Sequence, residues 1–153
     1  MGVFKFLKNI GRNDEKDAVE AQEEMNRELI KANKLLRFVM GLGLNIEDLR
    51  VEYDDGKATL RGRAATQADK EKAILAVGNT EGVAEVDDQM QVSVAEAEAR
   101  LYTVQKGDSL SKIAKQYYGD PMKYPVVFEA NKPMLDNPDL IYPGQVLRIP
   151  VET

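Results

Sequence analysis

The chain contains neither cysteine nor histidine. Without cysteine it has no disulfide framework, no thiolate nucleophile and no cysteine metal ligand. Without histidine it lacks the commonest general base and the commonest zinc ligand. Carboxylate and lysine chemistry remain open, but no nucleophile–base pattern accompanies those residues. Together these absences predict a protein that is not an enzyme.

Two further absences concern membranes and nucleic acids. No apolar run approaches the roughly 20 residues that a membrane-spanning helix needs. The opening MGVFKFLKNIG lacks the apolar core and cleavage site of a signal peptide, because Lys5 and Lys8 interrupt it. The net charge is −5, and no Lys/Arg block is interleaved with aromatic residues, as nucleic-acid binding requires. We therefore expect a cytoplasmic monomer without a transmembrane segment that binds no nucleic acid.

The length of 153 residues suits one ordinary domain or two small ones. The run Ala-Glu-Ala-Glu-Ala at 95–99 has no apolar side chain larger than alanine, which indicates a linker. Strand and helix patterns occur on both sides of it. The sequence thus predicts an α+β protein with one domain at 1–94, including N-terminal helical segments, and a second at 100–153.

The first domain opens with charged, helix-prone residues and continues as strand, strand, helix, strand. Apolar residues recur at helical spacing within 13–43, at Ala18, Met25, Leu29, Ala32, Leu36 and Val39. Asp55-Gly56 predicts a tight hairpin rather than a calcium loop. Thr66 and Asp69 resemble a capping box at the start of the next helix, and Gly78 predicts its end. Asp88 falls on the apolar face of the third strand and breaks its alternation.

The segments VEYDDGKATLRGRA, ADKEKAILAVGN and EGVAEVDDQMQV resemble the BON family over about residues 44–94. The Gly82-Val83 pair is typical of that family. The resemblance implies a binding module that carries no catalytic motif, with a three-stranded sheet and helices. An unrelated small α+β domain is the alternative.

The second domain carries motifs of another family. YTVQKGDSLSKIAKQYYGD, FEAN and LIYPGQVLRIP resemble LysM domains over 100–150. The resemblance implies a βααβ fold and a shallow groove for N-acetylglucosamine polymers. Carried onto this chain, the groove residues are Gly107, Asp108, Ser109, Leu110, Ile141, Tyr142 and Gly144. Pro125 departs from a regular second helix, so we expect that helix to begin near Tyr124.

The pattern of glycines suggests a cation site. Phe4, Leu7 and Ile10 share one face of an expected short helix that ends at Gly11, and a second expected helix ends at Gly78. A helix C-terminus leaves up to four carbonyls unpaired and bears partial negative charge. Two such ends that meet would offer neutral carbonyls to a weakly hydrated monovalent ion, with no carboxylate cluster nearby to favour Ca²⁺ or Mg²⁺. Two ordinary glycine caps, with the N-terminal segment packed on the BON domain, are the alternative.

The whole chain is similar to the BON–LysM family of bacterial cytoplasmic potassium-binding proteins. That resemblance favours one K⁺ held by backbone carbonyls, with candidates at Leu7, Ile10, Gly78, Thr80 and Val83, in an ion sensor or buffer. LysM would then dock a protein partner or stabilise the molecule. Two readings stay open beside it: a LysM protein that binds peptidoglycan, and a partner-binding protein without a ligand.

Overall fold

The computed structural model describes residues 2–6 and 18–151. Its elements, in chain order, are β1 (Gly2–Lys5), α1 (Ala18–Gly41), β2 (Ile46–Asp54), β3 (Lys57–Ala64), α2 (Gln67–Gly78), β4 (Glu85–Val92), β5 (Arg100–Thr103), α3 (Leu110–Tyr118), the 3-10 turn η1 (Pro121–Lys123), α4 (Tyr124–Ala130) and β6 (Val146–Ile149). The mixture of helices and strands confirms the α+β class. The division into domains at 95–99 stays a prediction, although those five residues belong to no helix or strand.

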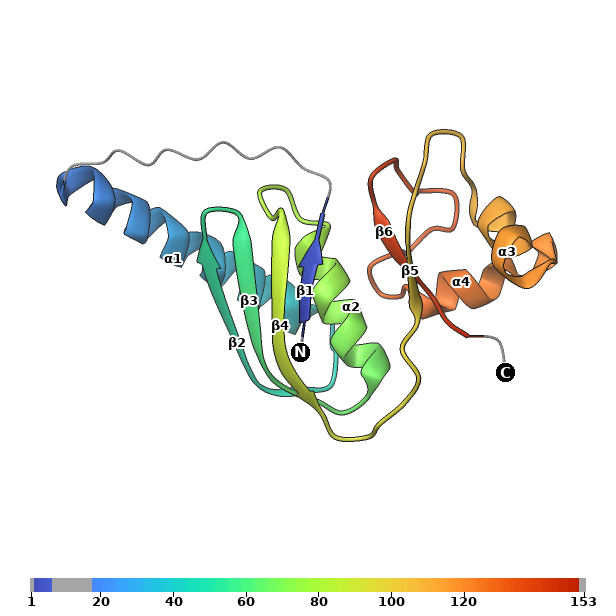
Figure 1. Cartoon of the computed structure of the whole chain (residues 1–153), viewed down its shortest axis with the longest axis horizontal. Coiled ribbons are helices and arrows are strands. Elements are labelled where there is room, and N and C mark those ends of the chain that lie inside the picture. The colour runs from blue at the N-terminus through green and yellow to red at the C-terminus, as the bar shows by residue number, and fades with distance from the viewer. Residues whose placement is uncertain (1, 7–17, 152–153) are drawn as a thin grey trace.

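The N-terminal half is a four-stranded sheet in the order β1-β4-β3-β2, with α1 and α2 packed on one face (Figure 1). β3 and β4 are parallel, and α2 makes the crossover between them. Alternate side chains of β3 and β4, such as Leu60 and Met90, point into the core with Leu35 and Ile74 of the helices. This period of two is what a half-buried strand requires.

The expectation of a helix at the N-terminus is wrong for residues 2–5. They form β1, which runs antiparallel to β4 and pairs Phe4 with Val86. Phe6 continues the pairing through a 2.7 Å hydrogen bond from its N–H to the Ala84 carbonyl. The sheet therefore has four strands rather than three. A short apolar segment cannot be assigned from periodicity alone, and the open edge of β4 supplies the hydrogen bonds that select a strand.

The predicted apolar stripe of α1 is correct only in its C-terminal half. Ala32 and Val39 are buried, but Leu35 takes the central place that was expected for Leu36. Met25 and Leu29 are 55% and 58% exposed, because the N-terminal half of α1 extends past the edge of the sheet (Figure 1). Helical spacing located the helix but could not show how much of it the sheet would cover.

Local signals along the first domain are confirmed. Asp55 and Gly56 adopt positive φ values of 44° and 84° and join β2 to β3 as a two-residue hairpin. Thr66 caps α2, since its hydroxyl oxygen accepts the Asp69 N–H at 3.1 Å and the same hydroxyl donates to the Asp69 carboxylate at 2.8 Å.

The C-terminal half has the βααβ order, with β5 and β6 antiparallel and α3 and α4 between them in the chain. Ser109 caps α3 by accepting the Lys112 N–H at 3.2 Å. Pro125 lies in the first turn of α4, where its missing N–H costs nothing, so the helix begins at Tyr124 as predicted. Asn131 is fully buried because its amide pairs with both backbone groups of Arg148.

Candidate cation loop, groove and domain interface

The loop after α2 brings three of the predicted cation ligands into one tight turn. The Asn79 N–H donates to the Leu75 carbonyl at 2.8 Å, and the Thr80 N–H donates to the Val77 carbonyl at 3.1 Å. The Val83 N–H then returns to the Thr80 carbonyl at 3.2 Å. Gly78, Thr80 and Val83 therefore lie within a single compact loop, 78–83. Leu7 and Ile10 lie outside the described residues.

Position 78 requires glycine because the Phe6 ring packs directly against its backbone, and not because the chain needs a positive φ there. α2 ends at Gly78 as predicted, but the φ of Gly78 is not positive, so this residue is not a left-handed cap. A Cβ on Gly78 would meet the ring of Phe6 at only 1.8 Å. The ring of the residue that follows β1 thus lies directly on the end of α2. This contact brings Phe6, the last described residue of the N-terminal segment, against loop 78–83.

Two side chains hold the other side of this loop. Lys31 of α1 donates its Nζ to the Glu81 carbonyl at 2.7 Å, and Tyr53 of β2 donates its hydroxyl to the Gly82 carbonyl at 2.6 Å. Burial raises the pKa of Tyr53, so the phenol stays protonated and keeps donating. Gly82 itself needs its positive φ of 89°. Loop 78–83 is therefore held by α1 and β2, in addition to the Phe6 ring that packs on Gly78.

The expectation that no carboxylate cluster lies near this loop is wrong. Carboxylate oxygens of Glu24, Glu28 and Asp55 lie within 4.8 Å of one another. They sit beside Tyr53 and Lys31, which line the same hollow. Burial and then the charge of Asp54 raise the pKa of Glu28. Sequence could not reveal this cluster, because α1 and the β2–β3 hairpin meet only in the folded chain.

Four of the residues predicted for the LysM groove, Asp108, Ser109, Leu110 and Ile141, line one hollow. A hollow of about 380 Å³ is lined by Asp108, Ser109, Leu110, Ser111, Tyr124, Pro138, Asp139 and Ile141. Gly107, Tyr142 and Gly144 lie outside its lining. Gly107 and Gly144 instead shape the two loops through positive φ values of 87° and 90°. Sequence reasoning missed Ser111, Tyr124, Pro138 and Asp139 among the lining residues.

Asp108 has a second role in the loop that precedes α3. Its carboxylate accepts the Tyr102 hydroxyl at 2.5 Å and the Gln105 N–H at 2.7 Å. The first of these bonds, with burial as a smaller cause, raises the pKa of Tyr102 to about 12. Asp108 thus ties the groove loop to β5.

The sequence predicts no site between the two halves, yet α2 lies against β6 there. Glu71 and Arg148 form a buried ion pair, with Nη2 and Nε of Arg148 at 2.9 and 3.1 Å from the Glu71 Oε1. Glu71 Oε2 also accepts the Ala99 N–H at 3.0 Å. The two residues are 77 positions apart in the sequence, so only the folded chain brings them together.

Asn79 makes the second link between the halves, and it belongs to loop 78–83. Its amide nitrogen donates to the Val146 carbonyl and its oxygen accepts the Val146 N–H, both at 2.9 Å. Val146 is also buried against the core of the N-terminal half. The candidate cation loop is therefore joined directly to the strand that follows the LysM groove loop.

Asp88, which breaks the apolar alternation of β4, is explained by α2. Its Oδ2 lies 2.8 Å from Lys70 Nζ, and its Oδ1 accepts the Met90 N–H at 2.9 Å. Only 2% of the Asp88 side chain and 13% of the Lys70 side chain are exposed. A buried carboxylate needs such partners, so Asp88 can occupy a core position.

Two domain families match this chain: the BON domain model over residues 20–94 and the LysM domain model over residues 102–150. The potassium binding protein Kbp of Escherichia coli O6:H1 is 44% identical over 155 residues, which span 99% of this chain and all of that protein. The chain belongs to the BON–LysM family that includes Kbp. An uncharacterized protein of Deinococcus radiodurans is 60% identical over 50 residues, which make up 33% of this chain and 19% of that protein.

Within residues 2–6 and 18–151, no helix has the length and apolar character required to cross a bilayer.

Proposed function

We propose that this protein binds one K⁺ ion through backbone carbonyls of loop 78–83 and of the segment after β1, and acts as a cytoplasmic K⁺ sensor or buffer. The candidate ligands are Leu7, Ile10, Gly78, Thr80 and Val83. The observation that carries the proposal is the contact of the Phe6 ring with Gly78, which brings the end of β1 against this loop. The name of the full-length relative, potassium binding protein Kbp, supports it.

The chemistry of the loop supports a monovalent ion. A carbonyl oxygen has two lone pairs, so the Thr80 carbonyl can accept the Val83 N–H and still contact an ion. The loop itself offers neutral carbonyl oxygens, which suit a weakly hydrated monovalent ion, whereas Ca²⁺ and Mg²⁺ prefer charged oxygens such as those of the separate cluster of Glu24, Glu28 and Asp55. The end of α2 adds its partial negative charge to the same place. Binding, rather than catalysis, is the function that these groups serve.

Thermal unfolding of the full chain in KCl and in NaCl, at equal ionic strength, tests the proposal. A ligand that binds only the folded state adds about 2.7 kcal/mol at a hundredfold excess over its Kd. For a chain of this length that corresponds to a rise in Tm of about 5–10 °C. Deleting residues 1–11 should abolish the difference between the salts, because it removes two ligands and the Phe6 contact.

A matched pair of tyrosine variants separates a loop effect from a general loss of stability. Tyr53→Phe removes the hydrogen bond to the Gly82 carbonyl, so its KCl-dependent rise in Tm should shrink. Tyr142→Phe, on an exposed tyrosine of the LysM half, should keep the full rise. Equal Tm in KCl and NaCl for the full chain would refute K⁺ binding. A larger rise in CaCl₂ than in KCl would assign the ion to the cluster of Glu24, Glu28 and Asp55 instead.

The LysM hollow supports glycan binding as a second candidate function. Its lining combines hydroxyl and carboxylate groups of Ser109, Ser111 and Asp139 with the apolar surfaces of Tyr124 and Ile141, a combination suited to sugars. Titration with N-acetylglucosamine oligomers should shift backbone amides at Gly107–Leu110 and Ile141–Gly144. Shifts elsewhere, or none at millimolar sugar, would leave LysM as a docking or stabilising module.

A further inference from the structure

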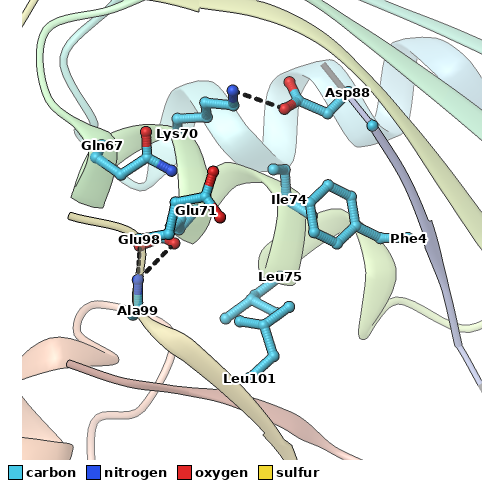
Figure 2. A pocket seen from close by; sticks show the side chains of 11 residues that line it. Phe4, Gln67, Lys70, Glu71, Ile74, Leu75, Asp88, Glu98, Ala99 and Leu101 are labelled. Carbon is cyan, nitrogen blue, oxygen red and sulfur yellow. Dashed lines mark hydrogen bonds and ion pairs between the residues drawn. The ribbon is translucent and has the colours of Figure 1, made fainter. Parts of the chain in front are cut away.

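A separate cavity lies where β1, β4, α2 and the start of the LysM half meet (Figure 2). Its volume is about 350 Å³, within the range of small-molecule sites. Phe4, Ile74, Leu75 and Leu101 form its apolar walls, and Leu101 comes from β5 while the others come from the N-terminal half. The cavity lining includes none of the proposed K⁺ ligands.

The charged groups deep in this cavity already have partners. Lys70 and Asp88 form an ion pair at one side (Figure 2). Glu71 is paired with Arg148 and accepts the Ala99 N–H. Because Asp88 neutralises Lys70, the cavity offers no net positive charge to an anion.

One acidic group at the cavity is not compensated in this way. Glu98 lies beside Glu71 in Figure 2. It is exposed, and no ion pair or hydrogen bond of its side chain is found among residues 2–6 and 18–151. The lining therefore carries one excess negative charge next to four apolar walls. Glu96, two residues earlier in the same linker, does not line the cavity.

We propose that this cavity binds a small primary amine with an apolar body, its ammonium group at Glu98 and its body against Phe4, Ile74 and Leu101. An ammonium group donates three hydrogen bonds, which the carboxylate oxygens of Glu98 and Glu71 can accept. An apolar body gains from leaving water for the walls. Because Ala99 and Leu101 complete the cavity, the bound amine also bridges the two halves of the chain.

Titration of the full-length protein with 2-phenylethylamine, followed by amide NMR, tests this inference. The amine is protonated at about pH 7, and 3-phenylpropionate provides a ligand of similar shape and opposite charge. We expect saturable shifts at Ile74, Leu75, Ala99 and Leu101 with the amine only. Running the titration in NaCl without K⁺ makes the result independent of the proposed potassium function.

Two glutamate variants provide the matched control. Glu98→Gln should weaken amine binding about fivefold, as expected for an ion pair that is partly open to solvent, whereas Glu96→Gln should bind as the parent does. Leu101→Ser, at a half-exposed wall position, should weaken binding without removing the charge. Equal effects of the two glutamate variants, or equal binding of phenylpropionate, would show only general attraction and overturn the inference. So would the absence of saturable shifts by about 10 mM amine, where a millimolar site would be nearly filled.

Discussion

Replacing Arg148 by methionine should separate the two halves of the molecule before it unfolds either one. The guanidinium donates twice to Glu71 Oε1 and once, at 3.0 Å, to the Ala130 carbonyl. Methionine preserves much of the apolar stem but provides no donor. The Glu71 carboxylate would then keep only the Ala99 N–H as a partner.

The size of the effect follows from burial. The side chains of Arg148 and Glu71 are 8% and 9% exposed. Removing one partner of a buried ion pair costs about 3–5 kcal/mol, because the other charge stays desolvated. Since Glu71 keeps the bonds from Ala99, we expect the lower end, about 3 kcal/mol or a hundredfold change in the docking equilibrium. Replacing both residues by methionine should cost much less, because neither charge is then stranded.

Hydrogen exchange of the Val146 amide measures docking directly. This N–H donates across the interface to the Asn79 side chain, so it exchanges when the halves separate. Leu147, the next residue of β6, lies opposite Tyr102 within the LysM half and serves as an internal control. Arg148→Met should accelerate exchange at Val146 about a hundredfold and leave Leu147 protected.

Two results would refute this reasoning. Unchanged exchange at Val146 in Arg148→Met would show that the ion pair does not hold the halves together. A double variant as poorly docked as the single one would show that packing of the arginine stem, rather than a stranded carboxylate, is the cause.

The remaining predictions concern single contacts in each half. Gly78→Ala places a methyl group in the Phe6 ring, so it should lower the free energy of unfolding by about 1–3 kcal/mol. Chemical denaturation measures this change. An unchanged denaturation midpoint would contradict the contact between Phe6 and Gly78. The bond from Tyr102 to Asp108 raises the pKa of the phenol to about 12, so the folded state favours its protonated form. Its stabilisation is therefore complete below about pH 10 and is lost as the pH rises through the folded value. Unfolding midpoints between about pH 9 and 12 should fall more steeply in the parent protein than in Tyr102→Phe, and parallel curves would argue against this bond.

Features set by neighbouring residues could be predicted from the sequence. The Asp55-Gly56 hairpin needs only two residues that tolerate positive φ. The Thr66 cap depends on a hydroxyl just before the start of α2, and the ring of Pro125 limits where α4 begins. The order of strands and helices in the LysM half follows from several such signals in succession.

The tertiary structure decided the features that depend on distant partners. Residues 2–5 form a strand because β4 offers an unpaired edge, which their own apolar pattern cannot reveal. Asp88 is accommodated in the core because Lys70, on another element, neutralises it. The candidate cation loop also depends on distant partners, because Lys31 and Tyr53 fix the carbonyls of Glu81 and Gly82. The sequence alone predicted only that carbonyls would be free near the glycine that ends the helix.

The interface between the halves shows this limit most clearly. From the sequence, Glu71 is an ordinary polar helix residue, Asn79 an ordinary residue of the loop after that helix, and Arg148 a residue of a short strand, because nothing in their neighbours marks them as partners. The packing of α2 against β6 buries Glu71 and Arg148 and so makes their pairing necessary, and it brings Asn79 to the backbone of Val146. Local sequence determines backbone shape through steric preference and capping, whereas burial of a polar group is a property of the whole fold.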